Sequence, residues 1–291
     1  MSKVDSVKTE ISGMRGNDIL KIRSILEGTG AKLGGAIIKD ALKLLPGGHF
    51  VVFGAEIIGT AIETTLEEMA NRELSFREEF RVALSASTVI TKIAQRIDNG
   101  ETLRTDEYFF KNQGLYNSSA EEIFEGILLQ CKREHEEKKI PYVSNVMVSI
   151  AFSNEIGVAE ANQLLNIIER FTYRQLALIA VIKDNQYCKL NLRSEVLNSP
   201  EYREIALLQE LVDLSKLGVV QQISTNVFPI EFTKEYIMER LISREFDSIS
   251  SWEDILPQIL VLTSLGEVIY DFMELSELPD EDVENSRISL S

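Results

Sequence analysis

Cysteine and histidine stand four residues apart in the stretch CKREHEEKK, which begins at Cys131. On one helix face, Cys131 and His135 would offer two ligands to a zinc ion. A structural zinc site needs four ligands, however, and the other residues of these types, Cys188 and His49, have no partner nearby in the sequence. We therefore predict a solvated, salt-bridged helix face here, and no metal site.

No catalytic motif accompanies that stretch. His135-Glu136 begins the H-E-x-x-H pattern of zinc proteases, but Lys139 stands where the second histidine would lie. The glycine-rich phosphate-binding loops and the G-x-S-x-G nucleophile turn are also absent from the sequence. With two histidines and 46 acidic residues, no general base can be singled out. The sequence thus predicts a protein that is not an enzyme and takes no cofactor.

The composition is that of a globular protein with a strong acidic bias. The 291 residues are 44% hydrophobic and 26% charged, and their net charge is −16. Because nonspecific nucleic-acid binding depends on Lys and Arg, we do not expect nucleic acid as a partner. Two cysteines give no disulfide framework, and the opening residues MSKVDSVKTE lack a secretory signal. We expect a cytoplasmic protein, with peripheral attachment to the inner membrane as a further option.

The hydrophobic periodicity predicts a mostly α-helical protein with a small two-stranded β element near its end. The uncharged runs at 44–55 and 140–154 are too short to span a membrane as helices. In chain order we expect a flexible arm at 1–16, a glycine-rich amphipathic helical hairpin at 17–73, a helical domain at 74–171, a winged-helix-like domain at 172–271 and a mobile acidic tail at 272–291.

Two helices of the central domain carry recognisable start signals. Ser75 and Glu78 form a capping box at the start of a helix over 75–98, since each side chain can bond the other's backbone amide. Ser119 and Glu122 predict the same arrangement for a helix over 118–139. Two shorter helices are expected at about 141–152 and 158–170.

The last domain reads as helix, helix, strand, insertion, strand, helix, which is the order of a winged-helix-like unit. Gly218 follows the last periodic leucine of the second helix and predicts a left-handed cap leading into the strand VVQQI. The returning strand is QILVLT, and SLGEVIYDFMEL is the closing helix. The second helix, 200–217, holds four acids and two basic residues, a net charge of −2, so a groove-reading role is disfavoured. We predict a protein-interaction or dimerisation unit.

The stretch GGAIIKDALKLLPGGHFVVFGAEIIGTAIE, residues 34–63, is the most unusual in the chain. On a helix over 32–45, three lysines share a narrow face opposite apolar residues, as in helices that lie at a membrane surface. Three interpretations stay open: a soluble core hairpin, a self-assembly surface, or a segment that engages a membrane. The candidate residues for membrane binding or self-assembly are Lys32, Leu33, Gly34, Gly35, Ile37, Lys39, Lys43, Leu44, Gly54 and Gly59.

From about Glu121 to Met273 the chain resembles the abortive-infection alpha (Abi-alpha) type of bacterial protein. The shared features are EEIFEGILLQ, the proline-started helix IPYVSNVMVSIA, the helix pair ANQLLNIIERFTYRQLALIAVI, LVDLSKLGVV and LTSLGEVIYDF. The most specific part is L-G-[VIL]-[VIL] after a leucine-rich helix, followed later by L-T-x-[LF]-G. The resemblance implies a role in antiphage defence and supplies no catalytic residues.

Together these features predict a non-enzymatic antiphage protein of the abortive-infection type. Its C-terminal region would bind a partner and control a self-associating or membrane-active N-terminal hairpin. The expected partners are further copies of the chain, a protein partner or phage trigger, and an anionic membrane surface. The alternatives are a winged-helix transcriptional regulator or antitoxin-like DNA-binding protein, and an oligomeric scaffold.

Overall fold

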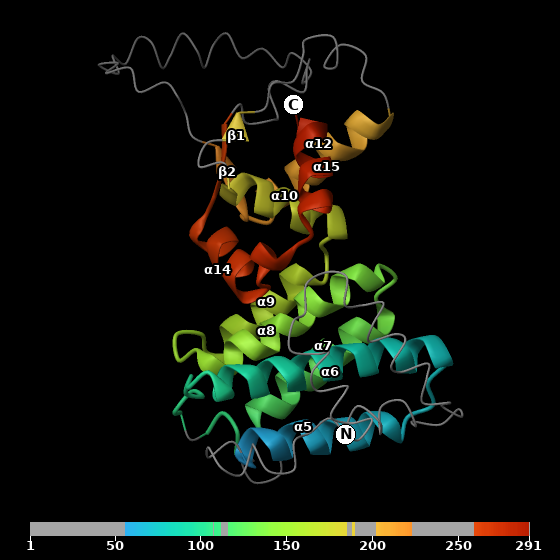
Figure 1. The fold of residues 1–291 in the computed structure, drawn as a ribbon, viewed down its shortest axis with the longest axis vertical. Helices are drawn as coiled ribbons and strands as arrows, with labels where there is room; N and C mark the ends of the chain where they lie inside the picture. Colours follow the sequence, from blue (N-terminus) through green and yellow to red (C-terminus); the bar gives the residue numbers. More distant parts are fainter. Residues whose placement is uncertain are drawn as a thin grey trace, which may run out of the picture. The chain divides into compact units, whose positions relative to one another are not determined.

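The computed structural model describes residues 56–106, 108–111, 116–184, 188–189, 202–222 and 259–290 (Figure 1). These residues fall into two compact units. Unit 1 holds the described residues up to Tyr173 together with Ile269–Pro279, and unit 2 holds those of Arg174–Val268 and those from Asp280 onward. The predicted flexible arm at 1–16 and residues 17–55 of the predicted hairpin lie outside the described residues.

The prediction of a mostly helical protein is confirmed for the described residues. The helices described before Tyr173 are α5 (Glu56–Ala70), α6 (Phe76–Asp98), α7 (Ser119–Arg133), the short 3₁₀ turn η1 (Glu137–Lys139), α8 (Ile140–Phe152) and α9 (Val158–Ile168). The elements that follow are α10 (Tyr173–Asp184), β1 (Cys188–Lys189), α12 (Tyr202–Lys216), β2 (Val220–Gln222), β3 (Ile259–Leu262), α14 (Ser264–Phe272), η3 (Leu275–Glu277) and α15 (Asp280–Leu290).

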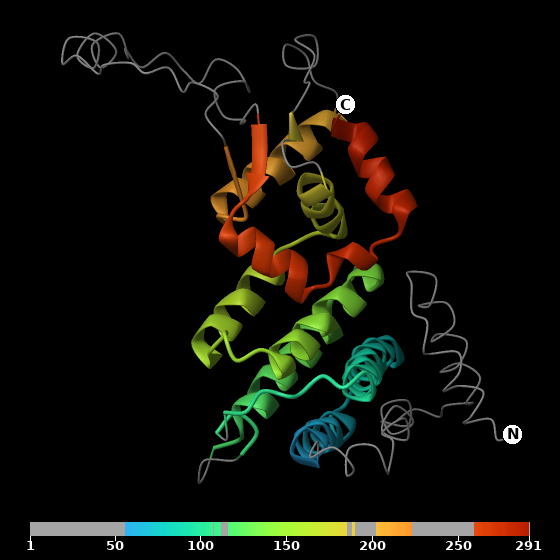
Figure 2. The same ribbon diagram turned by 60° about the vertical axis from the view of Figure 1, so that its left-hand side comes forward.

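The apolar faces of these helices build the core of unit 1. Helix α6 packs on α7 and α8, and α7 also packs on α5, α8 and α9. Figures 1 and 2 show α5 and α6 running side by side. Phe124 of α7 is among the largest side chains that are fully buried. On α5 the buried positions recur every three or four residues, which is the spacing of one helix face: Ile58, Ala61, Ile62, Thr65, Leu66 and Met69.

The capping box predicted at the start of α6 is confirmed. The Ser75 hydroxyl accepts from the Glu78 amide, and the Glu78 carboxylate accepts from the Ser75 amide. The side-chain hydrogen bond from Ser75 is the main cause that lowers the pKa of Glu78 below its ordinary value.

The capping box predicted for the next helix is one residue out of register. Ser118, and not Ser119, is the N-cap of α7, and its partner is Glu121 rather than Glu122. The predicted helix over 118–139 was also too long, because the backbone turns extended at Glu134. The sequence has two adjacent serines followed by two adjacent glutamates, so a capping box could form from Ser118 with Glu121 or from Ser119 with Glu122. The first pair is the one that the fold buries.

The two caps differ in burial, so their removal should have different effects. We expect Ser118→Ala to lower the free energy of unfolding by about 2 kcal/mol, the upper end of the range for N-caps, because a buried amide and the Glu121 carboxylate lose a partner. Ser75→Ala removes an exposed cap and should lower it clearly less. Urea unfolding of the two variants measures both values, and equal losses would contradict this assignment.

The small antiparallel pair of strands that the sequence predicts is present in unit 2: β2 runs antiparallel to β3 (Figure 2). Val220 lies opposite Leu262. A further short strand, β1, extends the pair to three strands in the order β1-β3-β2. The two-residue strand β1 adds to the other edge of β3, with Cys188 opposite Leu260. A two-residue strand is too short to show a hydrophobic periodicity in the sequence. It also comes soon after the buried helix α10, so the sequence has no separate signal for it.

Residues from Phe272 onward do not form the mobile tail expected from their acidic composition. Met273, Leu275 and Leu278 are buried in unit 1, and α15 begins at Asp280. Acidic and apolar residues alternate here, so the leucines face the core while the carboxylates face outward or pair. A count of charges hides this alternation.

Candidate functional site

Most of the residues predicted to act at a membrane or in self-assembly lie outside the described part of the chain. This holds for Lys32, Leu33, Gly34, Gly35, Ile37, Lys39, Lys43, Leu44 and Gly54. Gly59 is the exception: it lies on α5, where it is partly buried. No helix in the described ranges combines the length and apolar character needed to cross a membrane.

The cysteine and histidine considered as zinc ligands do not converge. Helix α7 ends at Arg133, between the two residues, so they do not share a helix face. Cys131 is fully buried, and burial raises the pKa of its thiol to about 12. The His135 side chain is 89% exposed.

The carboxylates beside His135 are engaged within the protein. Ligand atoms of Glu134, His135 and Glu136 lie within 4.8 Å of one another. Glu134, however, holds the ammonium of Lys139 at 2.6 Å, and Glu136 accepts from the Tyr173 amide at 2.9 Å. The cluster is therefore explained by the fold, as a clasp between η1 and the chain after α9.

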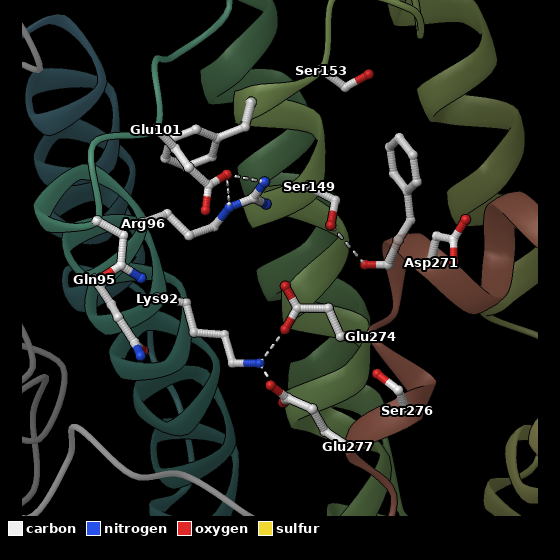
Figure 3. A pocket seen from close by; sticks show the side chains of 13 residues that line it. Lys92, Gln95, Arg96, Glu101, Ser149, Ser153, Asp271, Glu274, Ser276 and Glu277 are labelled. Atoms are coloured by element: carbon white, nitrogen blue, oxygen red, sulfur yellow. Dashed lines mark hydrogen bonds and ion pairs between the residues drawn. The ribbon is translucent and has the colours of Figure 1, made fainter.

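A polar cleft of about 510 Å³ opens in unit 1 between the last turns of α6 and α8 and the segment 271–277 (Figure 3). Its lining holds two cationic and four acidic side chains, a net charge of −2: Lys92, Arg96, Glu101, Asp271, Glu274 and Glu277. Figure 3 shows Lys92 reaching toward Glu274 and Glu277.

The two cations of the cleft are both neutralised, but by different parts of the chain. The Lys92 ammonium pairs with Glu274 and lies 2.5 Å from the Glu277 carboxylate. Arg96, one turn further along α6, donates to Glu101 at 2.5 and 2.8 Å and lies over the Phe152 ring, 4.3 Å from its centroid. Lys92 thus binds the segment that follows α14, whereas Arg96 pairs with Glu101, just after its own helix, and lies over Phe152 of α8.

Side chains of α8 hold the same segment by its backbone. The Asn145 amide donates to the Met273 carbonyl at 3.0 Å, and the Ser149 hydroxyl donates to the Phe272 carbonyl at 3.2 Å. We call residues 269–279 the strap. Its buried side chains are Ile269, Met273, Leu275 and Leu278.

The chemistry of this cleft is that of binding and clamping. Its cations are occupied by carboxylates. The Ser149 hydroxyl donates to a carbonyl, and the Ser153 hydroxyl accepts from the Glu155 amide. Nucleophilic catalysis needs a hydroxyl or thiol within hydrogen-bond reach of a general base. The described part of the cleft offers no such pair.

The two segments that carry the resemblance most specifically meet in unit 2. The Thr263 hydroxyl donates to the Gly218 carbonyl at 2.6 Å and accepts from the Gly266 amide at 3.1 Å. Gly218 has a φ of 73°, which is the left-handed cap predicted from the sequence. These residues therefore tie the end of α12 to the start of α14, and their role is structural.

Sequence reasoning missed Lys92 and the strap. The available signal was a lysine within the apolar run TVITKIAQRI, one turn before an arginine, and the repeat of glutamate and leucine in MELSEL. Long-range pairing between them is not visible in either stretch alone, since 182 positions separate Lys92 from Glu274.

In comparisons with known proteins, no family model matches the sequence, and no curated protein or solved structure matches it.

Proposed function

We propose that this protein is a non-enzymatic bacterial antiphage protein of the abortive-infection type, in which the described units hold and control a glycine-rich N-terminal effector segment. The effector in this proposal is residues 17–55. Self-association or entry into an anionic membrane is its activity. The finding that carries the proposal is the anchoring of α5, which directly follows this segment.

Helix α5 is fixed to unit 1 by its whole apolar face. Ile58, Ile62, Leu66 and Met69 are each fully buried. After the helix ends, Arg72 forms an ion pair with Glu125 of α7. Separating this face from its neighbours would expose these four side chains to water, at a free-energy cost of about 1.5–3 kcal/mol for each. We therefore place the limit of the effector before α5 and give α5 the role of an anchor.

The charge pattern supports a membrane surface over nucleic acid as the partner. The chain has a net charge of −16, whereas the segment 32–43 holds three lysines and one aspartate, a net charge of +2. Lysines on the polar face of an amphipathic helix pair with anionic headgroups.

Reversal of the three lysines tests the proposal. We expect Lys32→Glu with Lys39→Glu and Lys43→Glu to reduce dye release from anionic vesicles at least about tenfold, since each juxtamembrane lysine contributes about 1 kcal/mol at an anionic surface. The matched control reverses three exposed cations on described helices, Arg77, Arg133 and Lys216, with the same change in net charge.

The readouts separate the proposal from its alternatives. The proposal is supported if the parent protein and the control variant release dye and the lysine-reversal variant does not. Equal loss of release in both variants would mean that net charge alone explains the effect. No dye release by the parent protein or either variant would contradict the proposed membrane activity. The mass of the protein with and without detergent reports self-association, and a gel shift that survives competitor DNA would favour the DNA-binding alternative instead.

A further inference from the structure

The strap, residues 269–279, reaches unit 1 from a distant part of the sequence and is held there by three kinds of contact. Asn145 and Ser149 bind the backbone carbonyls of Met273 and Phe272. Met273 and Leu275 supply buried apolar contact. Lys92 of α6 joins the two strap carboxylates. Of these, the lysine contact is the one that depends on charge.

The backbone of the strap is held in an uncommon conformation. Glu274 has φ 51° and ψ 48°, in the left-handed region that side chains other than glycine seldom adopt. Such a conformation persists only where surrounding contacts hold it, and it is typical of segments that switch. Its side chain is one of the two that pair with Lys92, so the same residue carries the unfavourable turn and the contact that fixes it.

The ion pairs of Lys92 lie at the wall of the open cleft. The Lys92 side chain is 11% exposed, and those of Glu274 and Glu277 are 24% and 41% exposed. In the closed strap the ammonium is thus the most buried of the three charged groups. Lys92 is also the one group shared by both ion pairs, so its replacement removes both contacts at once.

We infer that the strap is a charge-gated latch: Lys92 locks residues 269–279 onto α6 and α8, and loss of this contact releases the strap while the helices of unit 1 stay folded. Release uncovers the apolar surface beneath Met273 and Leu275. This device does not depend on the activity proposed for residues 17–55, since it concerns described residues alone.

Hydrogen exchange of the full chain tests the latch at the strap itself. The amides of Met273, Glu274, Glu277 and Leu278 are hydrogen-bonded to carbonyls of the strap itself. Isolated turns this short are not stable in water, so a released strap unfolds and these amides exchange. We expect Lys92→Met to accelerate exchange over 273–278 by about tenfold or more, with exchange in α7 unchanged. Glu277→Gln, which keeps one of the two ion pairs, should give a smaller acceleration at the same amides.

Arg96→Met is the matched control, because Arg96 lies one turn away on the same helix and lines the same cleft but pairs with Glu101. It should leave exchange in the strap unchanged. The charge-swapped variant Lys92→Glu with Glu274→Lys and Glu277→Lys should restore slow exchange. Unchanged strap exchange in Lys92→Met and Glu277→Gln would overturn the latch, and so would acceleration that spreads equally through α7 or a charge swap that restores nothing.

Discussion

Replacing Lys139 by methionine should lower the free energy of unfolding of unit 1 by about 3–5 kcal/mol, the loss expected when one partner of a buried ion pair is removed. The Lys139 side chain is 2% exposed and that of its partner Glu134 is 8% exposed. The ammonium lies 2.6 Å from both the Glu134 carboxylate and the Phe171 carbonyl. Methionine keeps the volume but leaves a buried carboxylate unpaired.

Two further variants separate the ion pair from packing. Arg133→Met removes an exposed pair with Glu169, whose side chains are 69% and 51% exposed, and should cost less than about 1 kcal/mol. Lys139→Met with Glu134→Leu removes both buried charges and should recover most of the stability lost in the single variant. Urea unfolding measures all three. A Lys139→Met loss no larger than that of Arg133→Met would refute the buried clasp.

Gly266→Ala should destabilise unit 2 by about 3 kcal/mol, at the upper end of the usual cost of overpacking. A Cβ at Gly266 would lie 2.2 Å from the Val219 carbonyl oxygen and 3.2 Å from the Leu262 side chain. The Val219 carbonyl oxygen also accepts a hydrogen bond from the Thr263 amide. It therefore cannot move away from the new Cβ without breaking the hydrogen bond between the residue before β2 and the residue before α14.

Gly218→Ala gives the comparison that isolates the clash. Gly218 has a positive φ, but no atom lies within 4 Å of where its Cβ would be. It should therefore cost only the strain of a left-handed alanine, about 1 kcal/mol. Hydrogen exchange in α12 measures the free energy of opening unit 2 in each variant. Equal losses would mean that the close approach at Gly266 is relieved by backbone adjustment.

Local signals predicted much of the described fold. The capping box of Ser75 and Glu78, the left-handed Gly218 and the leucine spacing of α12 each depend on residues a few positions apart. Helices α6, α8, α9, α10 and α12 follow from such patterns, and so does the position of each of the strands β2 and β3 along the chain.

The features that the sequence did not predict depend on distant residues. Lys139 reads as one of several solvated charges in CKREHEEKK, and only packing shows that its ammonium lies under the Phe171 carbonyl. The strap reads as an acidic tail until Lys92 is placed beside it. In both cases a charged side chain lies in or near the core only because a partner distant in the sequence neutralises it, and local periodicity does not record such a partner.

The central claim is that residues 17–55 act on a membrane while α5 and the helices after it stay in place. Hydrogen exchange of the full chain, with and without anionic vesicles, tests it most directly. We predict slower exchange over 17–55 with vesicles present and unchanged exchange from Ile58 through α9. Unchanged exchange over 17–55, or protection that appears on α12 instead, would contradict the account.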